Sequence, residues 1–81
     1  MYSKDTLAIM KRFFLAIETL RECNDLVLYR FCEDNGIDYR HFYAQKKDLR
    51  KGYFEVGWLL PLIKDYGVSS TWLLTGKGKM L

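Results

Sequence analysis

The first quarter of the chain alternates apolar and polar positions with the period of an α-helix. Its apolar members, three and four residues apart, are Leu7, Met10, Phe13, Phe14, Ile17 and Leu20. The charged residues Lys11, Arg12, Glu18 and Arg21 lie at other positions of the same stretch. The spacing predicts an amphipathic helix over residues 5–21 that turns its apolar face toward a core, with Ser3 or Asp5 as its N-cap.

A second, shorter helix is predicted over residues 26–35. Asn24-Asp25 interrupts the first pattern, and these side chains offer a cap for the new helix. Its apolar positions are Leu28, Phe31 and Cys32. Gly36 ends the helix, because a residue without Cβ readily takes the left-handed conformation found beyond a helix end.

The turn at residues 35–38 joins this helix to a third one, predicted over residues 38–46. Asp38 is placed to accept hydrogen bonds from the first free N–H groups of the third helix. Ile37 is an apolar plug between the two helix ends, and Phe42 should face the core. A helix, a short turn with glycine and a second helix form the plan of a DNA-binding helix-turn-helix, although many other helical pairs use glycine in the same way.

A fourth helix is predicted over residues 55–66. The residues that we expect to point inward are Val56, Leu59, Leu60 and Ile63. Pro61 lies inside this helix, where proline removes one hydrogen bond and crowds the carbonyl four residues back, at Gly57. We therefore expect a kink or a late helix start.

A fifth helix is predicted over residues 69–75. Ser69 is its expected N-cap, and Gly76 is expected to end it. Gly67 is expected to end the fourth helix in the same way. The chain thus reads as five helices, with no internal repeat and no linker.

Composition places these helices in a single domain. A chain of 81 residues buries only about 60% of its unfolded surface. The 49% share of hydrophobic residues compensates, and it excludes a disordered tail. The longest apolar stretch, residues 57–63, is far shorter than the ~20 residues that span a bilayer. Since the N-terminus also lacks a signal-peptide core, we expect a soluble, cytoplasmic protein.

The two cysteines and the single histidine do not form a site. Cys23 and Cys32 stand nine positions apart and show no zinc-ligand spacing with His41. We expect both thiols to be small packing residues, and we expect no metal and no cofactor. A Cys32–His41 pair would lack a third orienting group, so the sequence predicts no enzymatic activity.

Two segments carry a family resemblance. The turn Gly36-Ile37-Asp38, with Cys32 four residues before it and Phe42 four residues after Asp38, resembles the helix-turn-helix of the lambda-repressor/Cro-like (XRE) family. The segment from Tyr66 to Gly78, YGVSSTWLLTGKG, is similar to the ending of many such domains, particularly phage-repressor-like ones. Over residues 7–78 the resemblance implies a compact all-α bundle of five short helices. It also implies a transcriptional regulator, most often a repressor, that binds double-stranded DNA and associates with the nucleoid.

If the third helix enters the major groove, its N-terminal outward positions are the ones that meet base edges. The candidate base-reading residues are Tyr39, Arg40, His41, Tyr43 and Ala44. Arg40 is the first choice, because a guanidinium pairs bidentately with guanine. The alternatives are tyrosines that cover the core edge, and an arginine and a histidine that are merely solvated.

A basic cluster follows the third helix, and net charge +3 adds only weak support for nucleic-acid binding. The candidate phosphate-binding residues are Tyr29, Arg30, Lys46, Lys47, Arg50 and Lys51. Tyr29 and Arg30 are included because Leu28 stands where many family members carry a glutamine that fixes a phosphate. A solubilising loop would show the same basic composition, so that alternative stays open.

Three unusual residues keep a second function open. In the third helix, Gln45 and then Lys46 occupy positions where the family usually has an apolar and then often an acidic residue, and Pro61 lies inside the fourth helix. Leu28, Gln45 and Pro61 feed the hypothesis of a helical protein-interaction module. Such a module would be an anti-repressor or an antitoxin with weak or no DNA binding.

The resemblance also implies a homodimer, because such modules read half-sites about one helical turn apart, ~34 Å. Trp58, Trp72 and Tyr66 could supply the dimer surface, although core packing is the commoner place for tryptophan. The sequence gives no sign of a small-molecule ligand or of a membrane partner.

Overall fold

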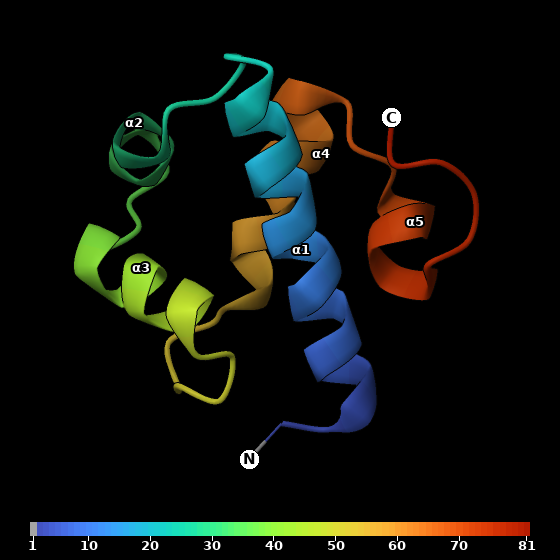
Figure 1. The fold of residues 1–81 in the computed structure, drawn as a ribbon, viewed down its shortest axis with the longest axis horizontal. Coiled ribbons are helices and arrows are strands. Elements are labelled where there is room, and N and C mark those ends of the chain that lie inside the picture. The colour runs from blue at the N-terminus through green and yellow to red at the C-terminus, as the bar shows by residue number, and fades with distance from the viewer. Residues whose placement is uncertain (1) are drawn as a thin grey trace.

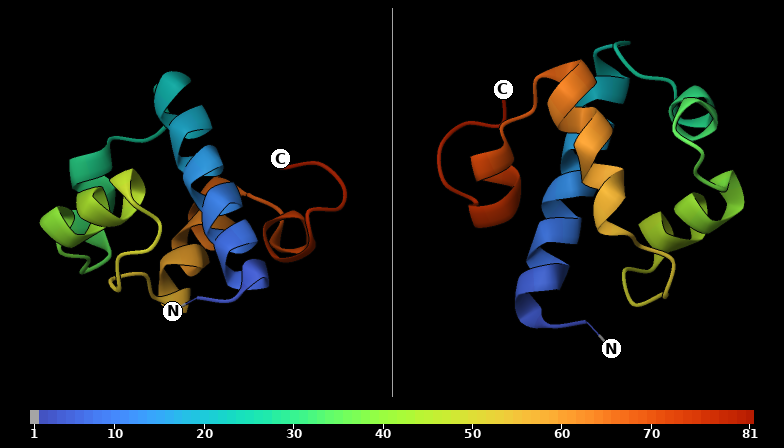
Figure 2. Two further views of the ribbon diagram at one scale, coloured as in Figure 1. Left: turned by 60° about the horizontal axis from the view of Figure 1, so that its bottom comes forward. Right: turned by 180° about the vertical axis from the view of Figure 1, so that it is seen from behind.

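A computed structural model describes residues 2–81, and within that range it is all-helical, without strands. The elements are α1 (Lys4–Glu22), α2 (Leu28–Asp34), α3 (Tyr39–Lys47), the 3₁₀-helix η1 (Val56–Trp58), α4 (Leu59–Tyr66) and α5 (Ser70–Thr75). In Figure 1, α1 runs through the middle, with α2 and α3 on one side and α5 on the other. Figure 2 shows α4 running alongside α1. The predicted bundle of five α-helices is confirmed.

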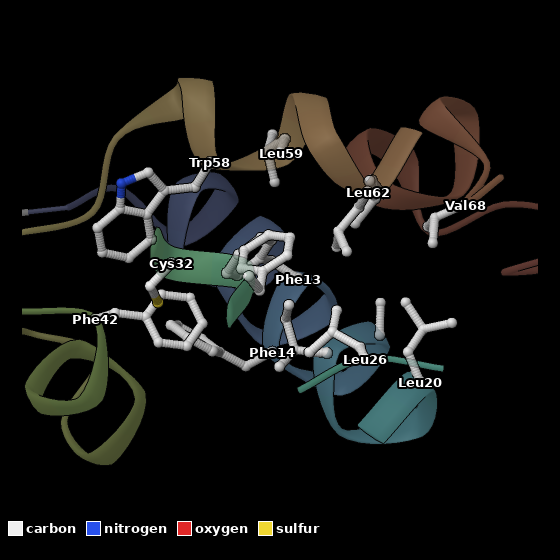
Figure 3. Close-up of a cluster of buried hydrophobic side chains, with 14 residues drawn as sticks. Phe13, Phe14, Leu20, Leu26, Cys32, Phe42, Trp58, Leu59, Leu62 and Val68 are labelled. Carbon is white, nitrogen blue, oxygen red and sulfur yellow. The ribbon is translucent and has the colours of Figure 1, made fainter. Parts of the chain in front are cut away.

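Phe13 of α1 lies at the centre of the core, which Figure 3 shows. Its ring centroid lies 4.9 Å from that of Phe14, 6.0 Å from that of Phe42 and 6.2 Å from that of Trp58. Each such aromatic pair contributes about 0.5–1.5 kcal/mol beyond the area it buries. Phe42 is fully buried, as predicted, so α3 is anchored to α1 through this cluster.

The predicted helix caps of α1, α3 and α5 are confirmed. The side chain of Ser3 accepts from the N–H of Thr6, and that of Ser69 accepts from the N–H of Trp72. Gly67 and Gly76 end α4 and α5 in the left-handed conformation. Local sequence was sufficient for these positions, because a cap bonds to residues only two or three positions away.

The start of α2 differs from the prediction. Asn24 takes the left-handed conformation (φ 62°), and the N–H of Asp25 donates to the carbonyl of Leu20 at 2.9 Å. These two residues therefore finish α1 and do not cap α2. The N-cap of α2 is Val27, whose side chain makes no capping hydrogen bond, and the helix begins at Leu28.

The late start of the fourth helix is confirmed. Pro61 is the third residue of α4, in the first turn, where N–H groups have no partner within the helix. The preceding turn, η1, is a 3₁₀-helix with fewer residues per turn than an α-helix. The inward positions that we predicted for an α-helix from residue 55 are therefore shifted. Val56 is consequently 77% exposed and Leu60 53% exposed, which makes the prediction that they point inward wrong.

The two cysteines have different surroundings. Cys32 is fully buried, as predicted, and burial raises the pKa of its thiol to about 11. Cys23 is exposed just after α1, so the prediction of a packing residue is wrong there. It follows Glu22 at the end of the helix, where the apolar stripe no longer faces the core.

The tryptophans belong to the core and its edge. Trp58 is buried, which removes it from the candidate dimer surface, while Trp72 and Tyr66 are partly buried and pack against the core. In residues 2–81, no helix combines the length and the hydropathy needed to cross a bilayer.

Candidate nucleic-acid interface

The turn between α2 and α3 is fixed by backbone hydrogen bonds. The N–H of Ile37 donates to the carbonyl of Cys32 at 2.8 Å, and that of Gly36 donates to Glu33 at 3.4 Å. With Gly36 at φ 65°, this is the Schellman arrangement that closes a helix. Ile37 then packs against the core, as predicted. The direction in which the chain leaves α2 is therefore set before α3 begins.

Asp38 caps α3, as predicted. Its carboxylate oxygen Oδ1 accepts from the N–H of Arg40 at 2.9 Å and from that of His41 at 3.3 Å. These hydrogen bonds, with that of His41 the larger cause, hold the pKa of Asp38 below its usual value. The cap thus satisfies two backbone N–H groups in the first turn of α3.

The candidate base-reading residues lie on α3 away from its buried Phe42. Tyr39, Arg40, His41 and Tyr43 are exposed, and Ala44 is partly buried. The Arg40 side chain is 89% exposed, and its guanidinium lies 3.6 Å from the carboxylate of Asp38. An exposed ion pair of this kind contributes little free energy, so Arg40 can reorient toward a ligand.

The tyrosines contact one another across the two helices. The ring centroid of Tyr39 lies 5.5 Å from that of Tyr29 on α2 and 6.2 Å from that of Tyr43. The ammonium group of Lys47 lies 5.4 Å from the centroid of Tyr43, over its face. Sequence reasoning missed this row, although the spacing of four residues between Tyr39 and Tyr43 was a signal for it.

Lys46 has a different environment from the other candidate phosphate-binding cations. Its Nζ lies 2.7 Å from Oε1 of Glu18 on α1, and the side chain is only 25% exposed. Glu18 also pairs with Arg21 at 2.7 Å, and hydrogen bonds from Arg21 and then Lys46 lower the pKa of this carboxylate. Lys46 therefore ties α3 to α1, whereas Arg30, Lys47, Arg50 and Lys51 are all exposed.

Gln45 is the one buried polar residue in the described part of the chain, and sequence reasoning gave it no role. Its Oε1 accepts from the N–H of Tyr53 at 2.9 Å and from that of Phe54 at 3.1 Å. Its Nε2 donates to the carbonyl of Leu49 at 2.8 Å and contacts Sδ of Met10 at 3.4 Å. The signal was a glutamine three residues after Phe42, where the resemblance implies an apolar side chain.

His41 packs on the same loop. Its ring is stacked on that of Tyr53, with centroids 4.1 Å apart and planes 1° apart. The candidate reading helix and the loop after it are thus joined through both an exposed stack and a buried amide.

No protein-family model, curated protein or solved structure matches this chain. In residues 2–81, the structure brings no group of three or more His, Cys, Asp or Glu residues together that could hold a metal ion. The geometry of α2, α3 and the loop that follows is therefore the basis on which a function can be inferred.

Proposed function

We propose that this protein is a transcriptional regulator, specifically a repressor, that binds double-stranded DNA in a sequence-specific way. The observation that carries the proposal is the fixed pairing of α2 and α3. Their turn is closed by Gly36 and capped by Asp38, and Phe42 anchors α3 to the core. A helix held in this way and exposed on its outer face fits the second helix of a helix-turn-helix, which lies in the major groove.

In this proposal the outer face of α3 reads bases. Arg40 pairs with a guanine through its guanidinium, as an exposed arginine at the N-terminal end of a reading helix can do. His41 and Tyr43 donate to bases or phosphates, Tyr39 lies beside them, and Ala44 touches a thymine methyl group.

Cations on both sides of α3 hold the sugar-phosphate backbone. Arg30, with Tyr29, lies on α2, and Lys47, Arg50 and Lys51 lie at the end of α3 and in the next loop. Such contacts position the protein and add affinity that depends on salt but not on sequence. Lys46 is the weakest member of the set, because Glu18 already pairs with its charge.

A homodimer completes the proposal. The molecule extends 29 × 28 × 19 Å, so two copies placed side by side can present their α3 helices about one helical turn of DNA apart, ~34 Å. Two half-sites at that spacing in the bound DNA would support the dimer, and sedimentation equilibrium would measure it without DNA.

The test is selection of bound duplexes from a random library with the full chain. The enriched duplex and a scrambled one are then titrated by fluorescence anisotropy at about 50 and 200 mM salt. We expect enrichment of a motif with guanine, tighter binding of the enriched duplex, and affinity that falls steeply with salt. No enrichment and no binding at the lower salt concentration would overturn the proposal.

A second function, a protein-interaction module of the anti-repressor or antitoxin kind, has its own supporting observation. Val27, Tyr29 and Tyr39 are exposed and line an open groove beside the end of α1. Tyrosine is enriched at protein interfaces because its ring is apolar and its hydroxyl bonds to polar groups. If the gene adjoins a small toxin reading frame, copurification with that product, abolished in Tyr29→Ala, would favour this function.

A further inference from the structure

The loop between α3 and η1, residues 48–55, carries two of the exposed cations and makes hydrogen bonds at most of its residues. At its start, Oδ1 of Asp48 accepts from the N–H of Arg50 at 3.0 Å and from its Nε at 3.3 Å. The N–H of Lys51 donates to the carbonyl of Asp48 at 3.1 Å, which closes a tight turn. These hydrogen bonds constrain the backbone that carries Arg50 and Lys51.

The far side of the loop is held by Gln45. Oxygen Oε1 accepts from two consecutive loop N–H groups, those of Tyr53 and Phe54, and Nε2 donates to the carbonyl of Leu49. With the contact to Sδ of Met10, all four hydrogen-bonding positions of the amide are in use. If the loop moved away, the buried amide would lose its hydrogen-bond partners, which costs free energy. The satisfied amide therefore favours the conformation in which the loop stays against α3.

The charged ends of the Arg50 and Lys51 side chains are not part of the Gln45 network. The Arg50 side chain is 87% exposed although its Nε contacts Asp48, and Lys51 is exposed. Ordering a long side chain or a loop on binding opposes association, because conformational freedom is given up in the complex. A loop that is already ordered avoids part of that cost.

We infer that Gln45 is the positioning residue of a preorganised phosphate-binding loop, whose ligand is the sugar-phosphate backbone beside the groove that α3 enters. This inference rests on the proposed function and adds a role for a residue that touches no DNA. Gln45 is set in α3 itself, so one buried side chain fixes the loop cations relative to the reading helix.

A double-mutant cycle on the full chain tests the inference. Gln45→Met keeps the volume of the side chain but removes the amide. Its effect on the affinity for the selected duplex is measured in two backgrounds, the natural chain and the variant that carries both Arg50→Ala and Lys51→Ala. We expect it to weaken binding of the selected duplex about three- to tenfold in the natural background. In the background without the two cations the effect should nearly disappear, because the loop then has no charge to position.

Two further measurements complete the experiment. Amide exchange of Tyr53 and Phe54 should speed up in Gln45→Met while that of core residues stays slow. Removal of Arg50 and Lys51 should reduce the slope of log K against log salt by about 0.9 for each phosphate that is no longer neutralised. Should Gln45→Met not fold, Gln45→Glu takes its place in the cycle with the same expectation, because it keeps the shape of the side chain but loses the Nε2 donor to the carbonyl of Leu49.

The outcomes separate this inference from the proposed function. If Gln45→Met weakens binding equally in both backgrounds, or in neither, its role is confined to folding and the inference is overturned while DNA binding stands. An unchanged salt slope after removal of the two cations overturns it as well. If the natural chain binds no duplex, the proposed function and the inference fall together.

Discussion

Arg12 of α1 caps the C-terminal end of α5, more than 60 residues further along the chain, by hydrogen bonds to its carbonyl groups. Its Nε donates to the carbonyl of Leu73 at 2.8 Å, and its Nη2 donates to that of Leu74 at 3.1 Å. The last carbonyl groups of a helix have no partner within it and carry partial negative charge. The guanidinium supplies donors and a positive charge together, so a residue on the long central helix fixes the small C-terminal one.

Arg12→Ala should lower the free energy of unfolding by about 1–3 kcal/mol, since it removes hydrogen bonds from a charged donor to two carbonyl groups. Urea denaturation followed by circular dichroism measures the change. Lys11→Ala is the matched control, because Lys11 is exposed on the same helix and its substitution should change stability by no more than about 0.5 kcal/mol. Equal effects of the two substitutions would contradict the capping role.

Gly76→Ala should destabilise the protein more than Gly67→Ala. Both glycines lie in the left-handed region, at φ 77° and φ 70°, where an alanine costs about 1–2 kcal/mol. A Cβ at Gly76 would in addition lie 3.1 Å from Nη1 of Arg12, whereas one at Gly67 would have no atom within 4 Å. Thermal unfolding of the two variants measures the difference, and an equal decrease would show that Arg12 moves aside at no cost.

Stability should fall with acid pH through three carboxylates. Hydrogen bonds lower the pKa values of Glu18, Asp38 and Asp48 in the folded state. The largest cause is the side chain of Arg21 for Glu18. It is the backbone N–H of His41 for Asp38 and the backbone N–H of Arg50 for Asp48. A carboxyl with a lower pKa when folded stabilises the protein above its unfolded pKa, ordinarily 4.5 for glutamate and 3.8 for aspartate. That stability is lost as pH falls through the folded pKa.

Urea midpoints measured between about pH 6 and pH 2.5 follow this change. Asp38→Asn keeps an oxygen to cap α3 but cannot titrate, so its midpoint should change less with pH than that of the natural chain. A parallel pair of curves would show that Asp38 contributes nothing to the pH dependence.

The two thiols should react at very different rates. Cys23 is exposed, whereas Cys32 is fully buried and its pKa is raised to about 11, chiefly by burial. Since only the thiolate reacts, the raised pKa slows the reaction of Cys32, and burial also blocks access of the reagent to its sulfur. A disulfide reagent should therefore label one thiol quickly and the second only on unfolding. Cys23→Ser should abolish the fast phase, and a remaining fast phase would contradict the burial of Cys32.

The sequence predicted the features whose partners are close along the chain. Ser3, Asp38 and Ser69 cap helices through N–H groups two or three residues away, and Gly67 and Gly76 end helices through their own backbone freedom. The start of α2 was missed because asparagine can also take the left-handed conformation, so Asn24 ends a helix where a cap was expected.

The candidate site was less predictable, because its contacts join distant segments. The spacing placed Arg40 and Tyr43 on the outer face of α3 correctly, since Phe42 marked the inner one. The pairing of Lys46 with Glu18 joins two different helices, and nothing near Lys46 in the sequence distinguishes it from Lys47. Gln45 was noticed only as a departure, because its partners follow in a loop without periodicity.

Arg40→Ala and Lys51→Ala should affect DNA binding in different ways. Arg40→Ala should reduce the preference for the selected duplex over the scrambled one by about 1–3 kcal/mol, because it removes a bidentate pair with guanine. Lys51→Ala should weaken both duplexes alike and lower the salt slope by about 1, because it removes a cation that neutralises a phosphate. Anisotropy titrations of the two variants on both duplexes measure these effects. If Arg40→Ala lowers the salt slope and leaves the preference intact, Arg40 holds a phosphate, and the reading role passes to His41 or Tyr43.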